Sequence, residues 1–179
     1  MNSTTDIINK YYKEGTPLYD CLVNHSRQVA EMAVEIAERH PELNLDKEFL
    51  YQAAMLHDIG ISYTDAPSIY CEGKEPYIRH GFLGAELLRK EGLDLHARVA
   101  ERHTGTGLSE TEIAERNLPL PLRNFEPETM EEQVICFADL FFSKTKPGQR
   151  RTPEQVEAGL NKFGEKSVSK FREWEKMFL

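Results

Sequence analysis

Four histidines and two aspartates stand at positions where the helical pattern of this sequence calls for apolar side chains. His25, for example, follows Leu22 by three residues and precedes Val29 by four, so it lies on the buried stripe of a helix. Neutral imidazole and carboxylate groups are the ligands that iron, manganese and zinc take in proteins. The candidate metal ligands are His25, His57, Asp58, His80, His103 and Asp139.

Asp139 is the most informative member of this set. It lies inside an apolar stretch, with Ile-Cys-Phe-Ala before it and Leu-Phe-Phe after it. A buried carboxylate without a partner is strongly unfavourable or takes up a proton, and a metal ion removes that cost. A single inward histidine is most often a hydrogen-bonded core residue. Four of them, together with two inward aspartates, predict a metal centre.

The elements that must position these residues are predicted to be helices. Nearly every segment has a helical hydrophobic period and none has the sustained alternation of a strand, so we expect an all-α fold. Asp46 and Asp94 are expected as N-caps, and Ser109 with Glu112 forms a capping box. We expect helices over residues 6–13, 17–40, 46–57, 79–91, 94–105, 109–116 and 128–144, a loop over 62–76, a rigid connector over 117–127, and two further helices within 153–178.

The chain is expected to form one domain over residues 1–179. Its 179 residues fit a domain of ordinary size, and no linker, repeat or low-complexity segment divides them. We expect a core over about residues 18–144, with the C-terminal helices of 153–178 packed on it. Phe171, Trp174 and Phe178 share one helix face, which predicts either a core contact or the contact of a homodimer.

The composition bears on partners and compartment. A net charge of −8 disfavours nucleic acid as a partner, although a bound metal lets an acidic protein take a small phosphorylated substrate. The N-terminal stretch has no apolar leader region and no run is long enough to cross a membrane, so no membrane association is expected. The three widely spaced cysteines form no CxxC pair, which indicates reduced thiols and a cytoplasmic location.

The motifs around these ligands resemble those of a known family. Residues 57–60 read HDIG, an upstream helix carries a histidine in NHSRQVA, and a downstream helix carries an aspartate in CFADLF. The order His, His-Asp, His, His, Asp resembles the dinuclear branch of the HD phosphohydrolase superfamily, over roughly residues 18–144. HGFLGAELLRKEGL and ERHTGTGLS are similar to parts of small HDIG-type proteins and of HD-type diadenosine tetraphosphate hydrolases. The resemblance implies a single HD-domain helical bundle.

The resemblance also implies a division of roles among the candidate ligands. It implies one metal held by His25, His57, Asp58 and Asp139. Asp58 would bridge to a second metal, which His80 and His103 also hold, and His57 with Asp58 would form the catalytic pair. The cofactors would be two divalent ions of iron, manganese or another transition metal. They would activate water for attack on a small phosphorylated metabolite, with a nucleotide as the first expectation.

The sequence departs from this family at two positions near the site. Close relatives often carry Lys or Arg three residues after the motif aspartate, where this chain has Ile61. We expect other residues to contact the substrate instead, and name Arg79, Lys144 and Thr104 as candidates. The GYP motif of cyclic-di-nucleotide phosphodiesterases is absent after His103, so that substrate class is not expected.

Two alternatives to hydrolysis remain open from the sequence. HD-type di-iron oxygenases have the same pattern of four histidines and two aspartates, so the ligands alone do not separate redox chemistry from hydrolysis. A metal-stabilised binding module without turnover is the other alternative. The complete ligand set favours an enzyme, and analogy at the level of the fold carries part of that preference.

Overall fold

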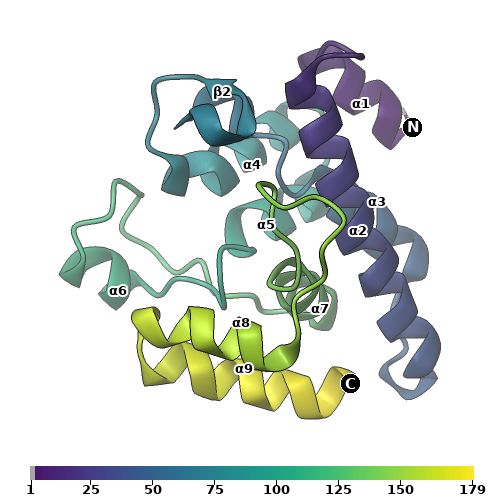
Figure 1. The fold of residues 1–179 in the computed structure, drawn as a ribbon, viewed down its shortest axis with the longest axis vertical. Helices are drawn as coiled ribbons and strands as arrows, with labels where there is room; N and C mark the ends of the chain where they lie inside the picture. Colours follow the sequence, from purple (N-terminus) through teal and green to yellow (C-terminus); the bar gives the residue numbers. More distant parts are fainter. Residues whose placement is uncertain (1–2) are drawn as a thin grey trace.

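The computed structural model describes residues 3–179 and is built almost wholly of helices (Figure 1). This confirms the expected all-α fold. The α-helices are α1 (Thr4–Tyr11), α2 (Pro17–Arg39), α3 (Lys47–Leu56), α4 (His80–Lys90), α5 (Asp94–Arg102), α6 (Glu110–Glu115), α7 (Met130–Asp139), α8 (Pro153–Leu160) and α9 (Glu165–Phe178). Short 3-10 turns η1 (Pro41–Leu43), η2 (Ile61–Tyr63), η3 (Pro67–Ile69), η4 (Tyr77–Arg79) and η5 (Asn161–Phe163) lie between them.

Helix α2 is the central element of the bundle. The Thr16 side chain caps its N-terminus and Pro17 occupies its first turn, where a missing N–H costs nothing. Leu22, Val29 and Ile36 recur at helical spacing and are buried in the main hydrophobic core. They face α3 and α7, which pack against α2, while α4 and α5 pack against each other beside them. The buried stripe of α2 therefore points to the place where the other helices meet.

The two C-terminal helices complete the core. Helices α8 and α9 lie side by side and α9 packs on α7 (Figure 1). Phe171, Trp174 and Phe178 are all buried, and the Phe171 ring stacks on Phe137 of α7 with centroids 5.5 Å apart. This aromatic face of α9 therefore serves the core of the chain itself.

The structure differs from the sequence expectations at several places, among them the ends of the helices expected over 94–105 and 6–13, which stop at Arg102 and Tyr11. The helix expected to run to residue 144 ends at Asp139, so Lys144 lies in the following loop. Asp94 is in the first turn of α5 but does not cap it, since the N-cap is Leu93 without a side-chain bond. The expected loop over 62–76 contains the two-residue strands β1 (Asp65–Ala66) and β2 (Cys71–Glu72), which pair antiparallel. These strands are too short to give a periodic signal.

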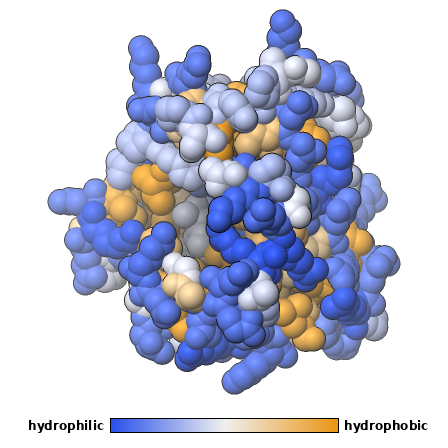
Figure 2. Space-filling model, viewed as in Figure 1, coloured by the Kyte–Doolittle hydropathy of each residue, from blue (hydrophilic) through white to orange (hydrophobic). Residues whose placement is uncertain are grey.

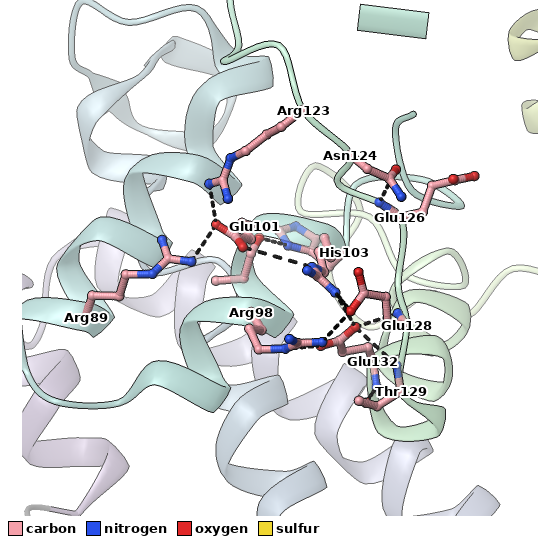
Figure 3. A network of polar contacts seen from close by, with 12 residues as sticks. Arg89, Arg98, Glu101, His103, Arg123, Asn124, Glu126, Glu128, Thr129 and Glu132 are labelled. Carbon is pink, nitrogen blue, oxygen red and sulfur yellow. Dashed lines mark hydrogen bonds and ion pairs between the residues drawn. The ribbon is translucent and has the colours of Figure 1, made fainter. Parts of the chain in front are cut away.

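A network of ion pairs fixes α5 against its neighbours (Figure 3). Glu101 of α5 is buried and accepts hydrogen bonds from Arg89 of α4 at 2.7 Å and from Arg123 at 2.9 Å. Glu132 of α7, also buried, accepts a hydrogen bond from Arg98 of α5 at 2.9 Å. Buried charges of this kind need such partners to be tolerated at all. The network therefore gives the C-terminal end of α5 a defined position.

Within residues 3–179, no helix is both long enough and apolar enough to cross a membrane.

Candidate metal centre

The six candidate ligands come from five helices and meet at one buried point. His25 projects from the middle of α2, His57 and Asp58 directly follow α3, and His80 opens α4. His103 caps the end of α5 and Asp139 is the last residue of α7. The four histidines and Asp58 are almost completely buried, and the Asp139 side chain is 17% exposed. Residues far apart in the sequence thus form one cluster.

Three of the histidines are oriented by the same local bond. The Nδ1–H of His57 donates to the Ala54 carbonyl at 2.6 Å, and that of His103 donates to the Ala100 carbonyl at 2.7 Å. His80 makes the corresponding bond to the Tyr77 carbonyl at 2.7 Å. A carbonyl only accepts, so Nδ1 carries a proton and Nε2 of each ring faces the site, where it could bind a metal in its unprotonated form.

Asp58 lies at the centre of the cluster, with its two carboxylate oxygens facing two different pairs of histidines. Oδ2 is 3.1 Å from Nε2 of both His25 and His57. Oδ1 is 3.4 Å from Nε2 of both His80 and His103. One carboxylate thus faces two separate donor sets.

Asp139 completes the first of these donor sets. Its Oδ1 lies 2.9 Å from His25 Nε2 and 3.6 Å from His57 Nε2. Three overlapping groups have ligand atoms within 4.8 Å of one another: His25, His57 and Asp58; His57, His103 and Asp139; Asp58, His80 and His103.

The hydrogen bonding of the cluster fits a cation. His25 Nε2, His57 Nε2 and Asp58 Oδ1 are buried without a hydrogen-bond partner, which is costly in an apolar interior. His80 Nε2 and His103 Nε2 lie 2.9 Å apart, although both rings already donate their Nδ1 protons elsewhere. Two lone pairs at that distance repel unless a proton lies between them or a metal ion binds both. The donor set of imidazole and carboxylate is therefore able to hold a divalent metal ion.

The pKa shifts of the clustered residues indicate that positive charge is favoured beside the two carboxylates. Burial alone would raise the pKa of Asp58, but His57 and Lys144 lower that pKa well below its usual range. Burial alone would lower the pKa of His57, but the carboxylates of Asp58 and Asp139 raise it to about 10. Burial and the neighbouring His103 lower the pKa of His80 to about 3. The half of the cluster around Asp58 and His57 therefore attracts a cation most strongly.

Lys144 is the only lysine among the expected substrate contacts, and it reaches the cluster. Its Nζ lies 2.5 Å from Asp58 Oδ2, and its side chain is 11% exposed. Burial alone would lower the pKa of Lys144, but Asp58 and Tyr77 raise that pKa above its usual value. The lysine therefore stays charged beside the carboxylate, in a loop that the sequence analysis had assigned to a helix.

The other two expected substrate contacts lie farther out. The Arg79 guanidinium donates to the Glu75 carboxylate at 2.6 Å, so its charge is already paired. Thr104 follows His103 and lines a separate cavity between the 104–108 segment and α8. Among residues 3–179, no hydrogen bond or ion pair joins the side chain of Arg79 or Thr104 to the six candidate ligands.

Two hollows lead from the surface to the cluster. One, of about 310 Å³, is lined by Asp139, Lys144 and Arg151, and the other, of about 350 Å³, is lined by His25 and Lys144. Lys144 borders both, so any ligand that reaches the cluster from either side passes its ammonium group. Arg151 is not among the substrate contacts expected from the sequence, because a charged residue in a turn is most often only solvated.

Gly60 of the HDIG motif has a packing role that the sequence analysis also missed. Its φ of −88° is open to any residue, but a Cβ would overlap the carbonyl oxygen of His80 and the backbone of Gly84. The glycine therefore lets α4 approach α3 closely enough for His80 to join the cluster.

We expect Gly60→Ala to lower the free energy of unfolding by about 3 kcal/mol and to weaken metal binding, because α4 must move away to make room. Denaturant unfolding and metal titration measure both effects. Gly159→Ala is the matched control, since a Cβ there meets nothing within 4 Å, and it should keep or slightly raise stability. Equal stability of Gly60→Ala and the wild type would contradict this packing role.

Comparisons with known proteins agree with this fold. The family model described as HD domain matches residues 22–142. The HD domain of the phosphodiesterase PgpH of L. monocytogenes, solved in complex with cyclic-di-AMP, superimposes with a TM-score of 0.55. The match covers 97% of this chain and 94% of that one at 16% sequence identity, so it is a likeness of fold.

Three curated relatives are similar in sequence. An uncharacterized protein of Methanocaldococcus jannaschii is 36% identical over 70% of this chain and 68% of its own. Two proteins named tRNA (cytidine(56)-2'-O)-methyltransferase are also similar: that of Thermoplasma volcanium is 35% identical over 75% of this chain, and that of Picrophilus torridus is 33% identical over 67% of it. The matches cover 35% and 31% of those methyltransferases, so the chain spans about a third of their length.

Proposed function

This chain belongs to the HD domain family, and from that premise we propose that it is a metal-dependent phosphohydrolase acting on a small phosphorylated metabolite, foremost a nucleotide. The observation that carries the proposal is the double orientation of Asp58, whose two oxygens face two different pairs of imidazole nitrogens. That arrangement suits a carboxylate that bridges two cations. A small substrate also suits a chain whose net charge of −8 disfavours nucleic acid as a partner.

We propose that two divalent ions, of iron, manganese or another transition metal, share Asp58. The first would be held by His25, His57, Asp58 and Asp139, and the second by Asp58, His80 and His103. When bound, such ions accept phosphate oxygens and lower the pKa of water enough to supply hydroxide near neutral pH. No protein nucleophile is then required. None of the cysteines belongs to the three overlapping groups of ligand atoms described for the metal centre.

The residues of the chain supply orientation and charge around that chemistry. The backbone carbonyls of Ala54, Tyr77 and Ala100 hold three imidazole rings with their Nε2 lone pairs turned inward. Lys144 provides a charged ammonium at the edge of the cluster, where the motif position that often carries a cation is occupied by the buried Ile61. We propose that Lys144 contacts the phosphate and stabilises the charge that develops on it.

We expect Lys144→Ala to lower kcat/KM for hydrolysis by roughly a hundredfold, because the phosphate loses the ammonium group beside Asp58. Metal content should remain, since no metal ligand is removed. Lys146→Ala, which changes an exposed lysine of the same loop, is the control and should have wild-type activity. Full activity of Lys144→Ala would contradict a phosphate contact.

The proposal is tested against oxygenase chemistry by assaying the protein with manganese under anaerobic conditions. Hydrolysis should proceed at the same rate with and without oxygen, on a screen of nucleotides, sugar phosphates and generic phosphodiesters. Oxygen uptake that depends on iron, with no phosphate released from any of these compounds, would favour the oxygenase. Metal binding without turnover of either kind would favour the binding module. Methyl transfer is not proposed, because the chain spans only about a third of the similar methyltransferases.

A further inference from the structure

The separate cavity that Thr104 lines lies beside the metal centre, and the proposed function assigns it no role. It has a volume of about 410 Å³ and lies between residues 104–108, α6 and the α8–η5 segment. Figure 2 shows this face, which is hollowed near its centre and has both hydrophilic and hydrophobic residues around the hollow. A volume of this size is in the range of cavities that bind small organic molecules.

Two of the residues that line the cavity directly follow candidate metal ligands in the sequence. Thr104, which lines it, directly follows His103, and Leu140, which also lines it, directly follows Asp139. Leu140 and Arg151 line both this cavity and the hollow of about 310 Å³ at Asp139 and Lys144. Arg151 is held at this junction by donating to the Leu140 carbonyl at 3.2 Å. A phosphate at the metal centre and a group attached to it could therefore occupy the two spaces together.

The lining favours a flat organic group with polar edges. The Phe163 ring is 44% exposed, and the guanidinium of Arg116 and the ammonium of Lys162 lie 5.6 and 4.8 Å from its centroid. Val156 and Leu160 supply apolar surface. An aromatic ring can stack on a phenylalanine ring or a guanidinium, and the cations suit a ligand that carries phosphate.

Gly159 is the residue that keeps the cavity open. It lies inside α8, where glycine is less favourable than alanine by up to about 1 kcal/mol. Nothing in the packing requires a glycine, because a Cβ at this position meets no atom within 4 Å. Gly159 lines the cavity, so the missing side chain leaves room there.

We propose that this cavity binds the organic group of the phosphate substrate, and that the group is a planar aromatic ring such as a nucleobase. The inference rests on the proposed hydrolytic function, and it adds the part of the protein that selects the substrate. The C-terminal segment α8–η5 then contributes to specificity through Gly159 and Phe163, in addition to closing the core.

The test compares two phosphonates that are not hydrolysed, the methylene phosphonate analogue of adenosine monophosphate and methylphosphonate. Calorimetry measures their binding to the full chain loaded with manganese. Gly159→Leu should weaken binding of the nucleoside phosphonate by about tenfold or more, because leucine fills the cavity, and should leave methylphosphonate binding unchanged. Ala158→Leu adds a side chain one residue earlier, at an exposed position that does not line the cavity, and should change neither affinity.

Melting temperatures establish that the variants are folded, and Phe163→Ala provides a second perturbation that removes the ring from an exposed position. This variant should weaken binding of the nucleoside phosphonate several-fold and leave binding of methylphosphonate unchanged. Wild-type affinity of both variants for the nucleoside phosphonate would overturn the inference, as would equal affinity of the wild-type protein for the two phosphonates. In either case methylphosphonate binding would leave the proposed function standing. Failure of the manganese-loaded protein to bind any phosphonate would instead count against the proposed function, and the inference would fall with it.

Discussion

Asp58→Asn is expected to remove metal from both halves of the cluster and to lower the rate of hydrolysis by roughly a thousandfold or more. The carboxylate has one oxygen 3.1 Å from the imidazole nitrogens of His25 and His57, and the other 3.4 Å from those of His80 and His103. An asparagine keeps the shape but replaces one oxygen with an NH₂ group, which donates and cannot bind a cation. Metal analysis of the purified variant and its kcat/KM measure the two losses.

Two further variants provide a control and a separate test of the second metal. Glu31→Gln removes an exposed carboxylate of α2 and should leave metal content and activity unchanged. His80→Ala should lose the metal that we propose His80 and His103 hold, and should partly retain the other, because His25, His57 and Asp139 remain. Two metals per chain in the Asp58→Asn protein would contradict a shared carboxylate. A wild-type titration that ends at one metal would contradict the dinuclear arrangement.

Removal of metal is expected to lower the melting temperature by about 5–10 °C. A ligand present at a hundred times its Kd stabilises the native state by about 2.7 kcal/mol, and for a chain of this size each kcal/mol corresponds to about 2–4 °C. The physical reason is local. His57 Nε2 and Asp58 Oδ1 are buried without a hydrogen-bond partner, and a metal cation is a group that satisfies them.

Lys144 limits the size of this effect, because its ammonium lies 2.5 Å from Asp58 and already offsets part of the negative charge. The measurement is thermal unfolding before and after verified chelation, with manganese added back. The Asp58→Asn protein serves as the control, since a chain that binds no metal should not respond to the chelator. An unchanged melting curve of the wild-type protein after complete metal removal would contradict the coupling of metal binding and folding.

The helices and the convergence of the candidate ligands could be predicted because both leave periodic signals. His25 falls on the same stripe as Leu22 and Val29, and a polar residue on a buried stripe is visible in the sequence. The Ser109–Glu112 capping box also follows from spacing, and the structure contains it. Local rules of this kind depend on residues three or four positions apart.

Features that depend on distant parts of the chain could not be predicted in the same way. Lys144 was expected in a helix, but α7 ends at Asp139 and the loop that follows carries the lysine back to Asp58. The hydrophobicity of residues 140–142 continues the apolar pattern, so the sequence alone extends the helix too far. Asp94 likewise resembles an N-cap by type, yet Leu93 occupies that position.

The roles of Gly60 and Gly159 also depend on distant parts of the chain. A glycine just after a helical segment, such as Gly60, normally indicates only a helix end, whereas the main constraint on Gly60 is the backbone of α4 against it. Gly159 gives no signal in the sequence beyond a weak position in a helix, and its meaning appears only with the cavity that it borders. Close approach and empty space are both properties of the packed chain.

The central claim, that the metal-loaded protein hydrolyses a phosphate ester or anhydride, is tested most directly by the fate of solvent oxygen. The protein is loaded with manganese and incubated anaerobically in ¹⁸O-labelled water with a nucleotide identified in the substrate screen, and the released phosphate is examined by mass spectrometry after a single turnover. If water attacks phosphorus, as we propose, the phosphate carries one labelled oxygen and no oxygen gas is needed. Turnover that requires iron and oxygen gas, with no labelled phosphate formed, would contradict the proposed function.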